Sequence, residues 1–107
     1  MKMYINGHWV DKDDKINVIN PFDGSIIDTI PQADSSDIDA AIASASRGAE
    51  AIASMSAYER YQILHKATEL MEERLEDFGR TVTLEEGKVI AEGMGEAARA
   101  LETLTLS

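Results

Sequence analysis

The chain has 107 residues, enough for one small domain or part of one, and 44% of them are hydrophobic, which predicts a folded chain. Its 20 acidic and 10 basic side chains give a formal net charge of -10, which disfavours binding to nucleic acid or to an anionic membrane surface. No cysteine is present, so the chain contains no disulfide, no thiolate metal ligand and no thiol nucleophile.

The start of the chain shows no apolar run behind a basic cluster, as a secretory signal would. No stretch approaches the roughly 18 consecutive apolar residues of a membrane span. We therefore expect a soluble, cytoplasmic chain that does not enter a membrane.

A β-hairpin is predicted at the beginning of the chain. Asn6 and Gly7 separate two short β-rich runs, residues 3–5 and 8–10. Both residue types tolerate the positive φ angles of a type I′ turn, so this dipeptide is a strong hairpin signal.

A second hairpin is predicted after a charged link. The runs 16–19 and 25–30 flank the turn formers at 20–24, and Pro31 ends the second run. Gly24 stands where a left-handed conformation is needed to close the turn.

After Pro31 the apolar period changes from two residues to about 3.6, which predicts helices. Asp34 can cap the first helix, with Asp37 three residues later. Ser56 and Glu59 fit the capping box of a second helix, in which each side chain satisfies a backbone donor. The apolar stripe of the first helix comprises Ile38, Ala41, Ile42, Ala45, Ala49 and Ile52. That of the second comprises Tyr61, Leu64, Thr68, Met71, Leu75 and Phe78.

Two glycines are expected to shape the rest of the helical segment. Gly79 lies in a continuing helical pattern and indicates a bend, whereas Gly87 is expected to close a shorter helix as a left-handed cap. The pattern resumes at Ile90, and the chain stops at Leu106-Ser107 without a cap, a glycine or a charged tail, as we expect of a truncated chain.

These elements predict an α+β fragment of two short β-hairpins followed by three or four α-helices. We expect a β-hairpin region over residues 1–33 and a helical segment over residues 34–107 that is an incomplete domain.

Six short motifs occur in order along the chain. They are Tyr4-Ile5-Asn6-Gly7-His8-Trp9-Val10, Val18-Ile19-Asn20-Pro21-Phe22-Asp23-Gly24, Ile38-Asp39-Ala40-Ala41-Ile42, Glu59-Arg60, Leu84-Glu85-Glu86-Gly87-Lys88 and Gly95-Glu96-Ala97-Ala98-Arg99-Ala100-Leu101-Glu102-Thr103. Their order and spacing resemble the N-terminal segment of the NAD(P)-dependent aldehyde dehydrogenase superfamily over essentially the whole chain. Each motif alone is a common turn or helix pattern, so the combination carries the resemblance.

The resemblance implies that the chain is part of the first, dinucleotide-binding domain of an aldehyde dehydrogenase α/β fold. The implied parent reaction oxidises an aldehyde to a carboxylate with NAD or NADP, through a cysteine thioester. The catalytic cysteine, the general-base glutamate and the nicotinamide-binding residues would lie beyond Ser107. We therefore expect the chain alone to be inactive and to bind no cofactor. Its partner would be the remainder of the dehydrogenase, in a parent that is a homo-oligomer.

The sequence departs from the family pattern at three positions. Ala49 and Ile52 stand where the family commonly carries Phe and Trp, and Val89 stands where it commonly carries Pro. Looser packing around the first helix is expected, because aromatic surface is lost there.

The resemblance also suggests one metal site. Glu96 aligns with a position that helps to hold a structural monovalent cation in some family members, together with backbone carbonyls, here those of Val18 and Ile19; oxygen ligands suit such a hard cation. The alternative is that Glu96 is an ordinary helix-surface carboxylate. His8 and His65 have no second ligand at metal-binding spacing and are interpreted as structural or surface residues.

Two other functions are compatible with the sequence. The chain could be a non-enzymatic acidic helical protein whose exposed stripes dock a partner other than the rest of an enzyme. A monomer with a cooperative melt and no exposed apolar surface would favour this alternative over a fragment. It could also be a truncated or split gene product whose remainder is supplied by another chain.

Overall fold

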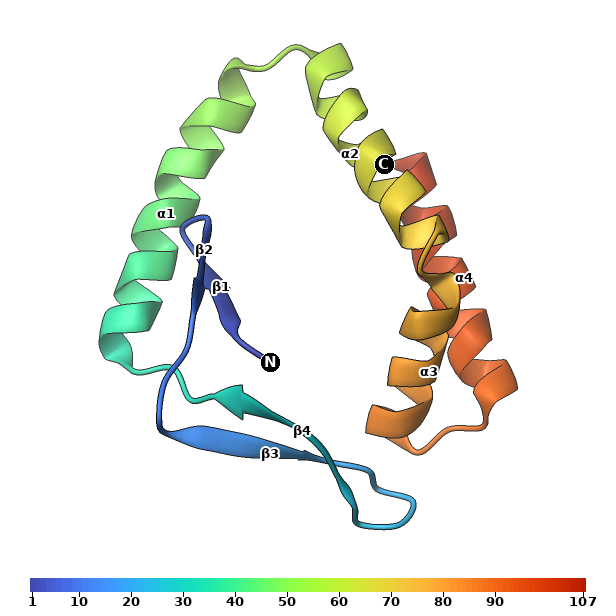
Figure 1. Cartoon of the computed structure of the whole chain (residues 1–107). Helices are drawn as coiled ribbons and strands as arrows, with labels where there is room; N and C mark the ends of the chain where they lie inside the picture. Colours follow the sequence, from blue (N-terminus) through green and yellow to red (C-terminus); the bar gives the residue numbers. More distant parts are fainter. The chain divides into compact units, whose positions relative to one another are not determined.

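The computed structural model describes residues 1–107 and contains two pairs of strands followed by four helices (Figure 1). The elements are β1 (Met3–Ile5), β2 (His8–Val10), β3 (Lys15–Ile19), β4 (Ile26–Pro31), α1 (Ser35–Ser54), α2 (Ala57–Glu72), α3 (Leu75–Glu86) and α4 (Ile90–Leu106). The predicted architecture is thus confirmed, with four helices. None of them is long and apolar enough to cross a membrane.

The chain forms two compact units. The first consists of Met1–Ile19 and Ile26–Met55, and the second of Asn20–Ser25 and Ser56–Ser107. The change from strands to helices falls between Pro31 and Ser35, close to the predicted boundary at residue 33. The division into domains at that boundary stays a prediction.

Both predicted hairpins are present in antiparallel register. Asn6 and Gly7 adopt φ angles of 52° and 80°, as a type I′ turn requires. The turn sets Tyr4 opposite Trp9, with ring centroids 5.0 Å apart. In the second hairpin the register shifts between Val18 and Ile19, which indicates a β-bulge there.

Helix α1 starts at the predicted cap. The Asp34 carboxylate accepts hydrogen bonds from the backbone N–H groups of Ser36 (2.8 Å) and Asp37 (3.1 Å). Asp37 Oδ2 in turn accepts from the backbone N–H of Asp34 at 2.9 Å, which completes a capping box. Lys12 forms ion pairs with Asp34 and Asp37, so the charged link before β3 is tied to the start of α1.

Helix α2 also begins at its predicted cap, Ser56, but the expected bend at Gly79 is wrong. The break between α2 and α3 lies at Glu73 and Arg74, where the Arg74 N–H bonds the Met71 carbonyl oxygen at 3.0 Å in a tightened turn. Gly79 lies inside α3 and is buried. A Cβ there would lie 2.2 Å from Met94 Sδ, so this glycine serves helix packing rather than bending.

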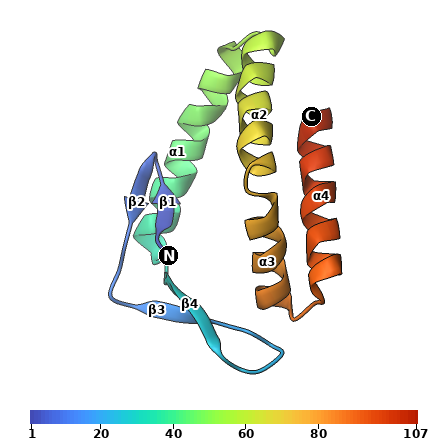
Figure 2. The ribbon, with the colours of Figure 1, turned by 45° about the vertical axis from the view of Figure 1, so that its right-hand side comes forward.

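Helix α4 lies alongside α2 and α3 in the second unit (Figures 1 and 2). Gly87, with φ 68°, ends α3 as predicted, and α4 follows after a short turn. Close packing continues at Gly93, where a Cβ would lie 2.4 Å from Thr83 Oγ1 and 2.5 Å from the Gly79 carbonyl oxygen. Thr83 Oγ1 is buried there without a hydrogen-bond partner.

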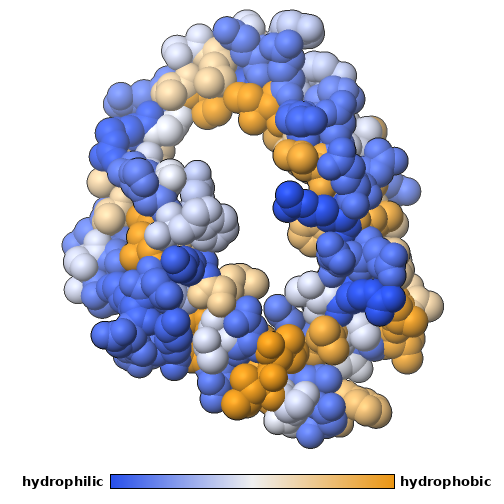
Figure 3. Space-filling model, in the orientation of Figure 1, coloured by the Kyte–Doolittle hydropathy of each residue, from blue (hydrophilic) through white to orange (hydrophobic).

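Neither unit encloses a hydrophobic core. Ala97, at 3% exposure, is the one buried hydrophobic residue, and no large side chain is fully buried. Exposed large hydrophobic side chains number 19, and hydrophobic residues form several patches on a visible face that is otherwise mostly hydrophilic (Figure 3). Helix α1 buries no residue at all, and its stripe residues Ile38 and Ile42 are 53% and 61% exposed. A chain with 44% hydrophobic residues thus leaves most of its large apolar side chains uncovered.

Candidate functional site

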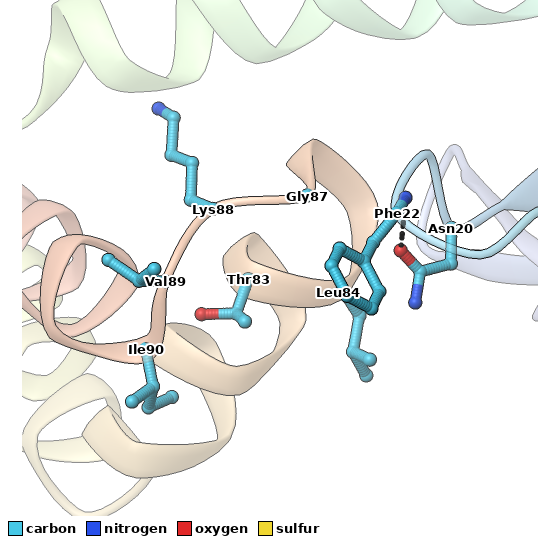
Figure 4. Close-up of a pocket in the computed structure, with 8 residues that line it drawn as sticks. All are labelled: Asn20, Phe22, Thr83, Leu84, Gly87, Lys88, Val89 and Ile90. Atoms are coloured by element: carbon cyan, nitrogen blue, oxygen red, sulfur yellow. Dashed lines mark hydrogen bonds between the residues drawn. The ribbon is translucent and has the colours of Figure 1, made fainter.

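A mainly apolar pocket of about 550 Å³ lies in the second unit. It lies between the Asn20–Ser25 loop, the end of α3 and the start of α4 (Figure 4). Its lining residues are Asn20, Phe22, Thr83, Leu84, Gly87, Lys88, Val89 and Ile90. Such a volume lies in the range of sites that accept a small molecule or a few side chains.

The loop that forms one wall is held by a dense set of hydrogen bonds. Asn20 is nearly fully buried, and its Oδ1 accepts from the Phe22 backbone N–H at 2.9 Å. The Asn20 N–H donates to the Ser25 carbonyl oxygen, and the Gly24 N–H to the Asn20 carbonyl oxygen, each at 2.8 Å. Gly24 has φ 75°, as expected from its place in the turn. These bonds fix the loop and leave Phe22 86% exposed.

The loop meets the turn between α3 and α4 through a close contact. A Cβ on Gly87 would lie 2.8 Å from Pro21 Cγ, so only a residue without a side chain lets the two segments approach. Gly87 therefore has two roles: it ends α3, and it leaves room for the loop to pack against the turn.

The one charged side chain of the pocket is neutralised locally. Lys88 Nζ pairs with Glu86 Oε2 at 2.5 Å and with Glu96 Oε1. The hydrogen bonds that the Lys88 ammonium group donates to these carboxylates, first to Glu86 and then to Glu96, raise the pKa of Lys88 to about 12. In Figure 4 the Lys88 side chain points away from Phe22, Leu84 and Ile90, so no charged group stands among these apolar side chains.

The residues predicted to hold a monovalent cation fall in different units. Val18 and Ile19 lie at the bulge of β3 in the first unit, and Glu96 lies on α4 in the second. A bulge disrupts the ladder locally, which suits carbonyls that serve as ligands. The hydrogen bond from Lys88 holds the pKa of Glu96 below its usual range, so the carboxylate is ionised. A cation bound by Glu96 would share this carboxylate with the ammonium group of Lys88. The cation site stays a prediction.

The histidines have separate surroundings. His65 stacks on Tyr61 with ring centroids 5.3 Å apart and lies 3.7 Å from the Glu69 carboxylate, while His8 is an exposed residue of β2. No group of three or more His, Cys, Asp or Glu side chains is arranged to hold a metal ion. Ser56 is occupied by its capping role, with Glu59 Oε2 2.8 Å from its hydroxyl.

The family model for aldehyde dehydrogenases matches residues 9–107. The chain belongs to the aldehyde dehydrogenase family. Over 106 residues it is 37% identical to the mitochondrial, acylating methylmalonate-semialdehyde/malonate-semialdehyde dehydrogenase of Homo sapiens, covering 97% of this chain and 20% of that protein. Over 99 residues it is 39% identical to the glutarate-semialdehyde dehydrogenase of Pseudomonas putida, covering 91% of this chain and 21% of that protein.

Solved aldehyde dehydrogenases share the fold of this chain. The crystal structure of aldehyde dehydrogenase 21 from Physcomitrella patens, in complex with the product succinate, matches with a TM-score of 0.93 and 34% identity, over 98% of this chain and 22% of that one. The NAD-dependent benzaldehyde dehydrogenase of Corynebacterium glutamicum matches with a TM-score of 0.89 and 31% identity, over 97% of this chain and 23% of that one. The chain thus spans about a fifth of the length of the curated relatives it matches.

The predicted membership of the family and the predicted fragment-like α+β fold are both confirmed. Sequence reasoning did not find the pocket, although Phe22 offered a signal, because a large aromatic residue between turn formers has no partner within its own turn.

Proposed function

We propose that this chain is the N-terminal scaffold of an aldehyde dehydrogenase that oxidises an aldehyde to a carboxylate with NAD or NADP. The observation that carries the proposal is the combination of a family match over residues 9–107 with a structure that buries one hydrophobic residue, Ala97. The family match over residues 9–107 favours this scaffold over the non-enzymatic acidic interaction protein.

The reaction of the parent enzyme needs groups that this chain does not supply. A cysteine thiolate adds to the aldehyde carbonyl carbon, a hydride leaves that carbon for the nicotinamide ring, and water with a general base cleaves the thioester. With no cysteine among its 107 residues, the chain alone cannot form the thioester. The remainder of the enzyme would come from a longer form of this chain or from a second polypeptide.

Cofactor binding is likewise proposed for the remainder of the enzyme. The first backbone donors of α1 and α2 are satisfied by Asp34 and Ser56, and no glycine cluster follows a strand in the manner of a dinucleotide fingerprint. The residues of this chain therefore contribute scaffold. A homo-oligomeric parent and a cytoplasmic location are part of the same proposal.

The test is a chimaera that joins residues 1–107 to the part of the Pseudomonas putida glutarate-semialdehyde dehydrogenase that follows its matching segment. We expect the chimaera to reduce NAD+ or NADP+ in the presence of glutarate semialdehyde, and the absorbance of NADH or NADPH measures this reaction. We expect no such signal from this chain alone. The intact relative and its downstream part alone serve as controls. A chimaera that does not fold, or folds without activity, would contradict the proposal, as would activity of the isolated chain.

A further inference from the structure

The pocket between the Asn20–Ser25 loop and the α3–α4 turn is bordered by exposed apolar side chains. Its rim carries Phe22 at 86%, Val89 at 64% and Ile90 at 48% exposure. Large apolar side chains gathered around one concavity are unfavourable in water, and such patches usually mark a contact surface.

The Phe22 side chain is exposed although the backbone of its loop is held by hydrogen bonds. Its N–H is bound by the buried Asn20 side chain, and the loop is closed by two backbone hydrogen bonds. The close approach of Pro21 to Gly87 fixes the same loop against the helical turn. A preformed wall of this kind lowers the ordering cost of binding.

The charges of the pocket select an apolar occupant. Lys88 is neutralised by Glu86 and Glu96 and directed away from the lining side chains, so it offers no free cation to an anionic ligand (Figure 4). Among the other lining residues, Phe22, Leu84, Val89 and Ile90 are apolar, whereas Asn20 and Thr83 are polar but uncharged.

We infer that this pocket receives an apolar side chain from the part of the aldehyde dehydrogenase that follows these residues. The inference rests on the proposed function. Solved relatives with the same fold have nearly four fifths of their chain outside the matching segment, since this chain covers 22% of one with a TM-score of 0.93. A corresponding remainder of the enzyme is the occupant to which the inference commits, and Phe22 and Val89 are its main contacts.

The test measures whether residue 22 becomes covered in the chimaera. Phe22→Cys introduces the one thiol of the isolated chain, because the natural sequence has none. In the isolated chain this thiol should react with a maleimide as fast as a free cysteine. In the chimaera, labelling of the peptide that contains residue 22, followed by mass spectrometry, should be at least roughly tenfold slower, as for a locally buried group. Val89→Cys is a second probe of the same rim, and the urea-unfolded chimaera gives the unprotected rate.

A second measurement separates contact from simple shielding. Phe22→Ser should lower the melting temperature of the chimaera and leave the helical signal of the isolated chain unchanged, whereas Phe22→Leu should restore most of the loss. An active chimaera in which both thiols label at the isolated-chain rate would overturn the pocket assignment and leave the proposed function intact. An inactive chimaera would instead contradict the proposed function.

Discussion

The two units of the chain are stabilised in different ways. The first unit is organised by polar interactions, namely the Asn6–Gly7 turn, the capping box of Asp34 and the ion pairs that join Lys12 to the start of α1. The second unit depends on contacts between helices, where Gly79 and Gly93 let α3 and α4 approach. The difference teaches that local hydrogen bonding is enough to define elements, whereas burial requires a surface to pack against, and the first unit has little of its own.

The largest expected effect comes from filling the contact between α3 and α4. Gly93→Ala places a methyl group 2.4 Å from Thr83 Oγ1 and 2.5 Å from a backbone oxygen, so the helices must separate. We expect a loss of about 3 kcal/mol in unfolding free energy, measured by urea titration of the helical circular dichroism signal.

A matched control lies two residues away on the same helix. A Cβ on Gly95 would meet nothing within 4 Å, so Gly95→Ala should stabilise α4 by about 1 kcal/mol through helix propensity. Equal effects of the two substitutions would show that the second unit is not held by close helix packing.

A smaller effect is expected from acid in the first unit. Hydrogen bonds from Lys12, from the Ser36 side chain and from the Asp37 backbone hold the pKa of Asp34 well below the ordinary value of 3.8. Because the folded pKa is lowered, the cap contributes its full stability above pH 3.8 and loses it as the pH falls through the lower, folded pKa. Amide exchange at Ser36 and Asp37 should therefore accelerate only below about pH 4.

Asp34→Asn is the control for this acid effect. Asparagine keeps a side-chain oxygen for the cap but does not titrate, so amide exchange at the start of α1 should lose this dependence on acid. If exchange in the variant still accelerated over the same pH range, another group would be responsible, and the local description of the first unit would need revision.

The smallest expected effect concerns the start of α4. Val89 has φ -70° and ψ 148°, values that proline adopts without strain, and the side chain is 64% exposed. Val89→Pro, which restores the residue common in the family, should raise the unfolding free energy by about 0.5 kcal/mol by restricting the unfolded chain. Thermal unfolding of the chain and of Val89→Ala would measure the difference, and destabilisation by proline would show that the turn needs the valine N–H.

The sequence predicted what depends on neighbouring residues. Asn6–Gly7, Asp34, Ser56 and Gly87 each carry a local geometric requirement, and all four act as expected. The role of Gly79 was missed because it depends on a contact with another helix. From the sequence alone, a glycine in a helix is compatible with a bend and equally with close packing against a residue such as Met94. The break at Arg74 was missed because no glycine or proline marks it.

The pocket was harder to predict from the sequence for the same reason, because it also depends on contacts between distant segments. The pocket joins Phe22 to Val89 and Ile90, residues separated by more than sixty positions, and periodicity within a segment does not report such pairs. The cation site rests on resemblance and awaits measurement. The order of the motifs in the sequence predicted the family, and the match of the family model over residues 9–107 confirmed it.

The contact of Pro21 with Gly87 bears on how the chain acquires its structure. The second hairpin can close as soon as its strands exist, but its loop belongs to a unit completed only by helices made much later in synthesis. Joining such distant segments carries a loop-closure entropy that local turns avoid, so the loop should dock late and detach early. During synthesis, the loop of the second hairpin would therefore form well before the α3–α4 turn that it contacts has been made.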